Sequence, residues 1–284
     1  MAVEIEIIKI DKSGPDLDIR TLISDDMGIG TYDTSWRLDS GKITNDMVIY
    51  DTKRPGRGIS LLLDPDNKDS VKMKLPIPCA DHDVEVFIDA ALRIGKKMNG
   101  FIKTSDGIEM PLQVFVENED SIREFNRKTI IDVCDKILGG ETDSFMLFGA
   151  FWPLSMGKTE AELFKADPLK FDEWMRQKQT TDYYYAGANF YRGKDGIFGL
   201  YVLGPDYDSV FPKKPTVPFG FAVGGDPLKC DDFRVAIANS AHEKIGELKY
   251  EEFISRLPAD KVSRYDEACI VINGLSDDEL KKLL

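Results

Sequence analysis

The stretch that decides the fold is 71–100, VKMKLPIPCADHDVEVFIDAALRIGKKMNG. Its first residues, Val71–Leu75, are typical of a strand, and the prolines at 76 and 78 end that strand because proline cannot donate a ladder hydrogen bond. From about Asp81 the apolar residues recur at helical spacing, at Val84, Phe87, Ile88, Ala91 and Leu92. Asn99-Gly100 supplies a left-handed cap. The stretch therefore predicts a strand followed directly by an amphipathic helix.

Strands and a second helix are predicted on both sides of this stretch. The opening segment VEIEIIKI alternates apolar and acidic residues, which indicates a strand with one solvated face. The other predicted elements of the first half are strands at Ile59–Leu63, Phe101–Thr104 and Leu112–Val116, and a helix from about Asp120 to Leu138. Residues 11–57 are rich in Asp, Gly and Ser and are typical of turns that join short strands.

The second half has the same mixed character. The predicted elements are a strand-like block at Ser144–Trp152, a helix opening with a capping box at Thr159–Glu162, a helix restarting at Asp167-Pro168, an aromatic strand region at Tyr183–Phe221, a short helix at Tyr250–Leu257, a strand at Ala268–Ile272 and a terminal helix opening at Ser276. Residues 231–245 fit a strand and a helix equally well.

Strands mixed irregularly with helices favour an α+β fold with mixed or antiparallel sheets and packed helices. The pair Gly139-Gly140 ends a predicted helix and is the best candidate boundary. We therefore expect two similar-sized α+β halves, residues 1–140 and 141–284, with one continuous domain as the alternative.

The chain is acidic throughout. Its 284 residues include 50 acidic and 37 basic side chains, a formal net charge of −13. The acidic excess is shared almost equally by the two halves, and nucleic acid and anionic membranes need clustered Lys and Arg. We expect neither as a partner, whereas a basic protein would be attracted.

The cysteine pattern predicts a reducing, cytoplasmic setting. Cys79, Cys134, Cys230 and Cys269 are widely spaced, and none forms a CxxC pair. Two of them lie in apolar stretches and are expected to be buried free thiols. The N-terminal segment lacks the features of a secretion signal, and no apolar run is long enough for a membrane span.

Aromatic density is the one feature that exceeds expectation. Residues 183–221 contain far more aromatic side chains than the chain average of 10% predicts. A binding face is one interpretation, because tyrosine combines apolar area with a polar tip; its candidate residues are Tyr183, Tyr184, Tyr185, Tyr191 and Tyr201. A sheet core of paired aromatics is the other. In a strand, Tyr184 must face away from Tyr183 and Tyr185.

Chemical motifs are weak. The segment Gly157-Lys158-Thr159 lacks the first glycine of a phosphate-binding loop, and Ser155 with Lys158 matches the S-x-x-K pattern without its partner motifs. The one place where a histidine adjoins carboxylates is Asp81-His82-Asp83, but successive residues at a helix start point in different directions. We assign no catalytic residue and no cofactor.

Three segments carry a resemblance to a known family: Leu75-Pro76-Ile77-Pro78 before the Asp83 helix, Tyr183-Tyr184-Tyr185-Ala186, and Val210-Phe211-Pro212. With these segments the chain resembles a family of bacterial proteins of about this length that are grouped as a domain of unknown function. The resemblance implies a cytosolic bacterial origin and no established activity.

The sequence therefore favours a non-enzymatic cytosolic protein that binds another protein, as immunity or regulator proteins do, with a basic partner and no metal. The alternative is a small-molecule hydrolase that uses Asp and Glu with a divalent metal at Asp81, His82 and Asp83. The oligomeric state stays open.

Overall fold

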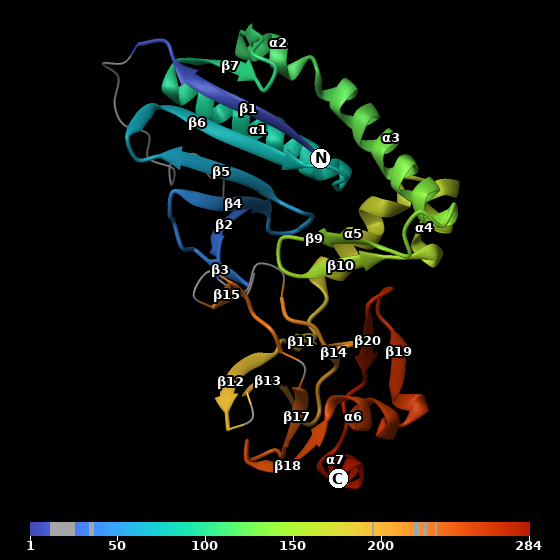
Figure 1. The fold of residues 1–284 in the computed structure, drawn as a ribbon. Coiled ribbons are helices and arrows are strands. Elements are labelled where there is room, and N and C mark those ends of the chain that lie inside the picture. The colour runs from blue at the N-terminus through green and yellow to red at the C-terminus, as the bar shows by residue number, and fades with distance from the viewer. Residues whose placement is uncertain (12–25, 34–36, 195, 219–221, 224–225, 231) are drawn as a thin grey trace. The chain divides into compact units, whose positions relative to one another are not determined.

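The computed structural model describes residues 1–11, 26–33, 37–194, 196–218, 222–223, 226–230 and 232–284 (Figure 1). The chain divides into two compact units of unequal length, Met1–Thr181 and Asp182–Leu284. Helices are combined with antiparallel and mixed sheets, so the α+β fold class predicted from the sequence is confirmed. The division between the units falls further along the chain than Gly139-Gly140, because the helices that follow this pair pack on the first unit.

Unit 1 is built on an eight-stranded sheet in which every neighbouring pair is antiparallel. The strand order is β3-β2-β4-β5-β6-β1-β7-β8. The strands are β1 (Ala2–Lys9), β2 (Met27–Tyr32), β3 (Leu38–Ser40), β4 (Asp46–Asp51), β5 (Ile59–Asp64), β6 (Asn67–Pro76), β7 (Gly100–Thr104) and β8 (Glu109–Met110). The alternation predicted for the opening strand is confirmed, because Ile5 and Ile7 are buried and Glu4 is exposed.

The predicted amphipathic helix is α1 (Asp81–Met98), and it ends at Asn99 in the left-handed conformation, with φ 47°. This helix lies along one face of the sheet and packs on its central strands (Figure 1). Together they enclose the core of unit 1, in which Phe87 is fully buried. The strand–helix order read from residues 71–100 thus sets the main packing of the unit.

The strand predicted at Leu112–Val116 is wrong: this segment is the short helix α2 (Leu112–Val116). The segment was expected to pair with Phe101–Thr104 across a turn at Ser105-Asp106-Gly107, but Pro111 precedes a helical turn instead. Leu112 packs on Gly95 of α1, and the Phe115 ring meets Phe87 edge-on at 6.0 Å between centroids. Tertiary packing therefore overrides the local pattern.

Three helices and a hairpin complete unit 1. They are α3 (Glu119–Leu138), β9 (Phe145–Phe148), β10 (Pro153–Met156), α4 (Lys158–Ala166) and α5 (Lys170–Thr180). The capping box predicted at Thr159 is wrong, because the helix begins earlier: Gly157 is the N-cap, and its N–H donates to Glu160 Oε2 at 3.1 Å. Helix α4 packs on α3 and α5, so all three belong to the same unit.

The N-terminus of α1 is fixed by an enclosed carboxylate. Its N-cap, Ala80, has no side-chain acceptor, and Asp83 one turn later is 1% exposed. Asp83 Oδ2 accepts the main-chain N–H groups of Arg57 at 2.9 Å and of Ala80 at 3.1 Å, and Oδ1 accepts that of Gly58 at 3.2 Å. One side chain thereby joins the β4–β5 connection to the start of the helix.

Unit 2 contains two four-stranded sheets, β11-β14-β20-β19 and β12-β13-β17-β18, and the short pair β15-β16. Their strands are β11 (Tyr184–Tyr185), β12 (Asn189–Gly193), β13 (Gly196–Leu203), β14 (Ser209–Pro212), β15 (Ala222–Val223), β16 (Asp226–Pro227), β17 (Asp232–Ala238), β18 (Lys244–Lys249), β19 (Val262–Arg264) and β20 (Cys269–Ile272). The ambiguous segment 231–245 is thus mainly strand, although its first residue lies outside the described residues.

Two helices and a 3₁₀ turn pack with these sheets: α6 (Tyr250–Arg256), η2 (Ala259–Lys261) and α7 (Asp277–Leu283). The cap predicted at Ser276 is confirmed, because its side chain accepts the N–H of Glu279. Phe211, Tyr250 and Phe253 meet in the core of the unit. Phe211, from the aromatic-rich region, thus packs in this core with two aromatic residues of α6.

We expect the change Asp83→Asn to destabilise unit 1 by about 3 kcal/mol, because buried main-chain N–H groups lose a charged acceptor. The measurement is the free energy of unfolding in urea. Asp89→Asn on the same helix is the matched control, since Asp89 is exposed and only pairs with Arg93; its effect should stay below about 0.5 kcal/mol. Equal losses for the two variants would contradict a central role for Asp83.

Candidate functional site

The five tyrosines proposed as a binding face do not share one surface. Tyr201 on β13 is 2% exposed and packs against Phe211 and Tyr250 in the core of unit 2. Burial raises the pKa of its hydroxyl to about 12, although a main-chain hydrogen bond from Thr216 acts in the opposite direction. Tyr201 therefore belongs to the sheet core, the alternative interpretation of the aromatic excess; two aromatics of that excess, Phe219 and Phe221, lie outside the described residues.

Tyr183 and Tyr185 lie on the inner side of their strand. Both rings meet the ring of Tyr265, each at 6.4 Å between centroids. The hydroxyl of Tyr185 lies 3.7 Å from Cys269 Sγ, and burial raises its pKa well above the ordinary value. Both side chains therefore pack against Tyr265 inside unit 2, and little of the Tyr185 surface is accessible to a partner.

Tyr184 faces the other way, as the strand period requires, and forms an exposed pair with Tyr207. The two rings meet edge-on at 5.7 Å, and the side chains are 39% and 44% exposed. The hydrogen bond from the N–H of Tyr184 to the main-chain oxygen of Asp208, 2.9 Å, places the two segments side by side. Tyr207 itself was not singled out from the sequence, although it contributes to the aromatic excess.

Carboxylates adjoin this pair along the chain. Asp182 and Asp206 are exposed, and Asp208 is half-buried with one oxygen accepting the N–H of Gly274 at 2.9 Å. Within the described residues none of the three carboxylates forms an ion pair. We call Tyr184, Tyr207, Asp182, Asp206 and Asp208 the acid–aromatic surface. Of these residues, Tyr184 lies on β11, the edge strand of its sheet in the part of the chain that the structure describes.

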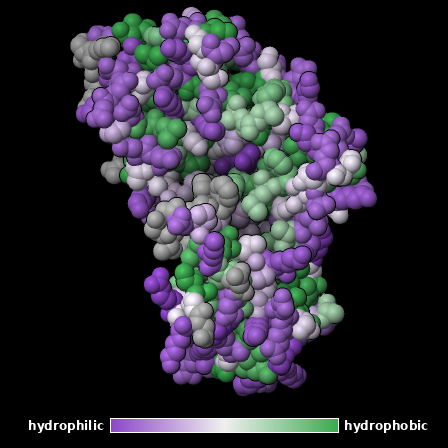
Figure 2. Space-filling view, in the orientation of Figure 1, coloured by the Kyte–Doolittle hydropathy of each residue, from purple (hydrophilic) through white to green (hydrophobic). Residues whose placement is uncertain are grey.

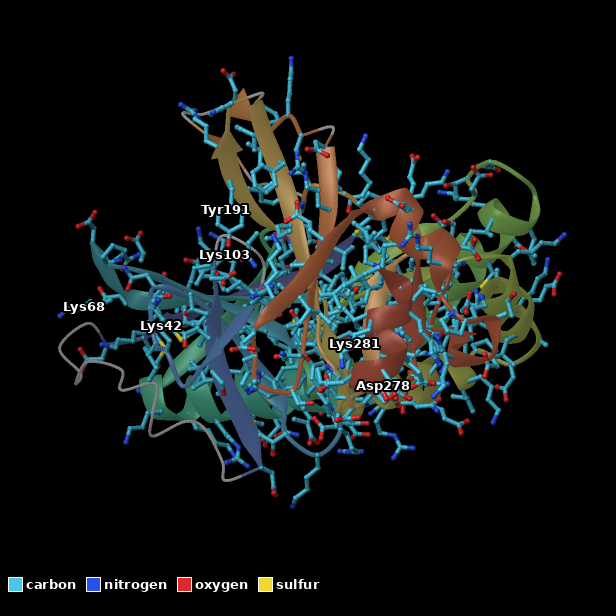
Figure 3. All side chains as sticks on the ribbon, turned by 90° about the horizontal axis from the view of Figure 1, so that it is seen from below. Lys42, Lys68, Lys103, Tyr191, Asp278 and Lys281 are labelled. Atoms are coloured by element: carbon cyan, nitrogen blue, oxygen red, sulfur yellow. The ribbon has the colours of Figure 1, made fainter. Side chains whose placement is uncertain are left out.

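Tyr191 belongs to a separate aromatic group on the second sheet of unit 2. Its ring stacks on Phe198 at 5.7 Å, and the Arg234 guanidinium lies 4.8 Å from the Phe198 ring centre. Arg234 is in turn paired with Asp232 and Glu247. Tyr191 projects from the edge strand β12 (Figure 3), and it provides a second exposed tyrosine, 49% exposed, for comparison.

The side chains of Asp81, His82 and Asp83 diverge rather than converge. Asp81 pairs with Arg127 at 2.6 Å, Asp83 accepts main-chain N–H groups, and His82 Nδ1 lies 2.8 Å from Asp172 Oδ1. No group of three or more His, Cys, Asp or Glu side chains in the part of the chain that the structure describes is arranged to hold a metal ion. The metal centre of the alternative hypothesis therefore finds no ready set of ligands there.

Asp172 supplies the cap that Ala80 cannot. Its carboxylate also accepts the main-chain N–H groups of Asp81 and His82, so a residue of α5 closes the N-terminus of α1. Burial acts to lower the pKa of His82, but the hydrogen bond to Asp172 and the charges of Asp83 and Asp172 outweigh it, and the pKa is raised. Burial acts to raise the pKa of Asp172, and the bonds to His82 reverse it, so this pKa is lowered. No local sequence pattern marks this long-range pair.

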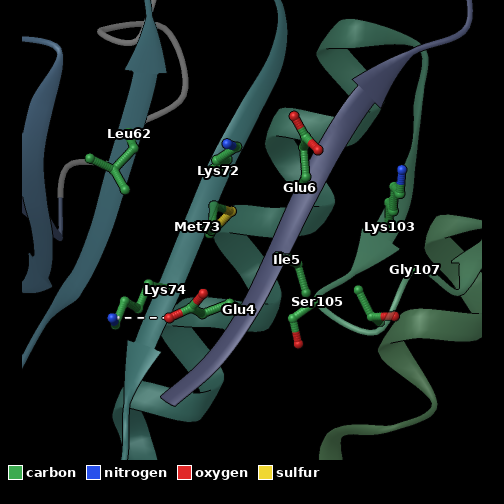
Figure 4. Close-up of a pocket in the computed structure, with 11 residues that line it drawn as sticks. Glu4, Ile5, Glu6, Leu62, Lys72, Met73, Lys74, Lys103, Ser105 and Gly107 are labelled. Atoms are coloured by element: carbon green, nitrogen blue, oxygen red, sulfur yellow. Dashed lines mark ion pairs between the residues drawn. The ribbon is translucent and has the colours of Figure 1, made fainter. Parts of the chain in front are cut away.

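A shallow hollow of about 450 Å³ lies on the face of the eight-stranded sheet opposite α1 (Figure 4). Its charged residues come from neighbouring strands in register: Glu4 pairs with Lys74 at 3.0 Å, and Glu6 lies between Lys72 and Lys103. Lys103 also faces Glu109 in register. Alternating charges of this kind are typical of a solvated sheet face, and they select no particular ligand.

Charged and polar residues cover most of the visible face of the molecule, with hydrophobic residues in separate patches (Figure 2). Among the helices that the structure describes, none combines the length and apolar character that crossing a bilayer requires.

The fold and these surfaces define a two-unit α+β protein whose first unit is fastened by buried polar side chains and whose second unit exposes tyrosines beside carboxylates. A family model described as domain of unknown function DUF4299 matches residues 2–283, so the chain belongs to this family. The family resemblance inferred from the sequence is thereby confirmed. No curated protein and no solved structure matches the chain.

The His82–Asp172 pair predicts how stability depends on pH. The raised pKa of His82 adds stability below the ordinary value of 6.5, which is lost as the pH rises through the folded-state pKa. The lowered pKa of Asp172 adds stability above the ordinary value of 3.8, which is lost as the pH falls through the folded-state pKa. We therefore expect the change Asp172→Asn to destabilise most at about pH 5–6, by about 1–2 kcal/mol because Asp172 is partly exposed.

The measurement is the free energy of unfolding in urea of the unchanged chain and of Asp172→Asn at a series of pH values. Asp132→Asn is the control, because Asp132 is exposed on α3. The coupling of His82 and Asp172 would be contradicted if Asp172→Asn lowered the free energy of unfolding by the same amount at every pH from acid to alkaline.

Proposed function

We propose that this chain is a non-catalytic binding protein of the bacterial cytoplasm and that its partner is a basic protein. The observation that carries the proposal is the exposed Tyr184–Tyr207 pair, of which Tyr184 lies on an edge strand, beside carboxylates that have no ion-pair partner among the described residues. Tyrosine rings bury a large area at low entropic cost, and they attract Lys and Arg side chains through their faces. The net charge of −13 adds long-range attraction for the same class of partner.

The thiols support a binding role rather than a nucleophilic one. Burial raises the pKa of Cys134 to about 11 and that of Cys269 to about 12, and it raises the pKa of Cys79 well above the ordinary value. Thiols in this state are protonated at neutral pH and react slowly. None of the four cysteines, all of which lie in the described residues, forms a disulfide, which agrees with a reducing cytoplasm.

The test uses two labelled peptides of equal length, one rich in arginine and one rich in glutamate, and measures binding by fluorescence anisotropy. We expect the arginine-rich peptide alone to bind. The change Tyr184→Ala should weaken its binding by about five- to tenfold, the effect of losing an aromatic contact with a cation. Added salt should weaken binding to the unchanged chain, because the carboxylates act through charge.

Tyr191→Ala is the matched control: this tyrosine is equally exposed but lies on the other sheet, so its loss should leave peptide binding unchanged. Thermal unfolding shows whether a variant loses binding or folding. Tyr184→Ala should unfold at the same midpoint temperature as the unchanged chain, whereas Tyr201→Ala, in the core, should unfold at a lower one. The proposal fails if both peptides bind equally, or if Tyr184→Ala and Tyr191→Ala weaken binding to the same extent.

A further inference from the structure

Arg57 in unit 1 is held rigidly by main-chain carbonyl groups. It lies between β4 and β5, where its own N–H donates to Asp83. Its Nε–H donates to the oxygen of Phe148 at 3.0 Å, and Nη1 donates to the oxygen of Pro78 at 2.8 Å. These two acceptors come from segments far apart in the sequence, so the guanidinium cannot turn without breaking both hydrogen bonds.

The charge of Arg57 has no direct counter-ion. Within the described residues no carboxylate lies within ion-pair distance of its guanidinium. Asp83 is near enough to act on it electrostatically, but both oxygens of Asp83 already accept main-chain N–H groups. Carbonyl oxygens carry only partial charges, and a partly buried cation whose hydrogen bonds all go to such dipoles is an attractive place for an anion.

One corner of the guanidinium remains available. Nη2 donates to no described residue. Among the fully enclosed side-chain nitrogen and oxygen atoms of the described residues, only His82 Nε2 lacks a hydrogen-bond partner, so Nη2 is not one of the fully enclosed atoms. Burial lowers the pKa of Arg57, yet an arginine stays protonated at neutral pH. A charged donor with fixed direction is therefore not completely enclosed.

A purely structural role explains only part of this arrangement. Joining Phe148 to Pro78 requires two donors, and Nε and Nη1 supply them. The third nitrogen and the full positive charge take no part in that bridge. A guanidinium oriented by two of its nitrogens presents the third in the planar geometry that carboxylate and phosphate oxygens accept.

We propose that Arg57 anchors a binding site for an oxyanion, a carboxylate or phosphate group that accepts hydrogen bonds from Nη2. This site lies in unit 1 and does not depend on the acid–aromatic surface of unit 2. Tyr32 adds a polar group nearby: its hydroxyl donates to the oxygen of Ala150 at 3.0 Å, and the charge of Arg57 acts to lower its pKa against the effect of burial.

The test titrates the full chain with inorganic phosphate and, separately, with acetate in a chloride buffer of constant ionic strength, using isothermal titration calorimetry. We expect saturable binding of at least one anion with a dissociation constant of about 1 mM or tighter. Arg57→Lys keeps the charge but loses the planar donor group, and it should weaken binding at least about tenfold. Arg192→Lys, at an exposed arginine of β12, is the control and should change nothing.

A second measurement avoids any loss of folding in the variant. In ¹H–¹⁵N NMR spectra of the unchanged chain, the bound anion should shift the side-chain Nε–H signal of Arg57, whose hydrogen bond to Phe148 holds it in place, and leave the Nε–H signal of Arg192 unchanged. The proposal is overturned if neither anion binds saturably, if Arg57→Lys binds as tightly as the unchanged chain, or if the anion leaves the Nε–H signal of Arg57 unchanged.

Discussion

The enclosed carboxylate of Asp83 is the constraint on which the rest of unit 1 depends. A buried charge is tolerated only where hydrogen bonds replace its lost hydration, and here three main-chain N–H groups do so. The close approach requires glycine at 56, because a Cβ there would overlap the carboxylate. The β4–β5 connection and the start of α1 are consequently fixed to one point.

Other buried polar side chains extend this junction outward. Asn126 of α3 bonds both the N–H and the C=O of Cys79, each at 2.9 Å, and thus fastens the segment before α1 to the next helix. Gln179 of α5 accepts the N–H groups of Phe151 and Trp152 in the β9–β10 turn, and Arg57 binds the oxygen that precedes that turn. Side chains acting on main-chain groups, rather than regular ladders, therefore join the sheet, the helices and the hairpin.

Elements that depend on neighbouring residues could be predicted from the sequence, whereas elements that depend on contacts with distant residues could not. The period of residues 84–92 and the glycine after Asn99 were sufficient for α1, and the Ser276 cap was visible because its partner, Glu279, is three residues away. Leu112–Val116 was mistaken for a strand because its contacts with Gly95 and Phe87 come from another helix. Asp172 lies ninety positions from His82, and no local pattern marks it as the cap of α1.

The candidate sites differ in the same way. The strand period alone separated Tyr184 from its two neighbours, so the exposed tyrosine could be predicted from three residues. Its partner Tyr207 and the role of Arg57 could not, because both arise from chain segments brought together by folding. Arg57 lies at the Asp83 junction: Asp83 holds its main-chain N–H, and the oxygens of Phe148 and Pro78 hold its guanidinium. Under the proposal, a residue that stabilises the fold is therefore also oriented for a ligand. Under the two proposals, a protein of net charge −13 presents carboxylates to a basic partner on one unit and holds the oriented Arg57 for an anion on the other.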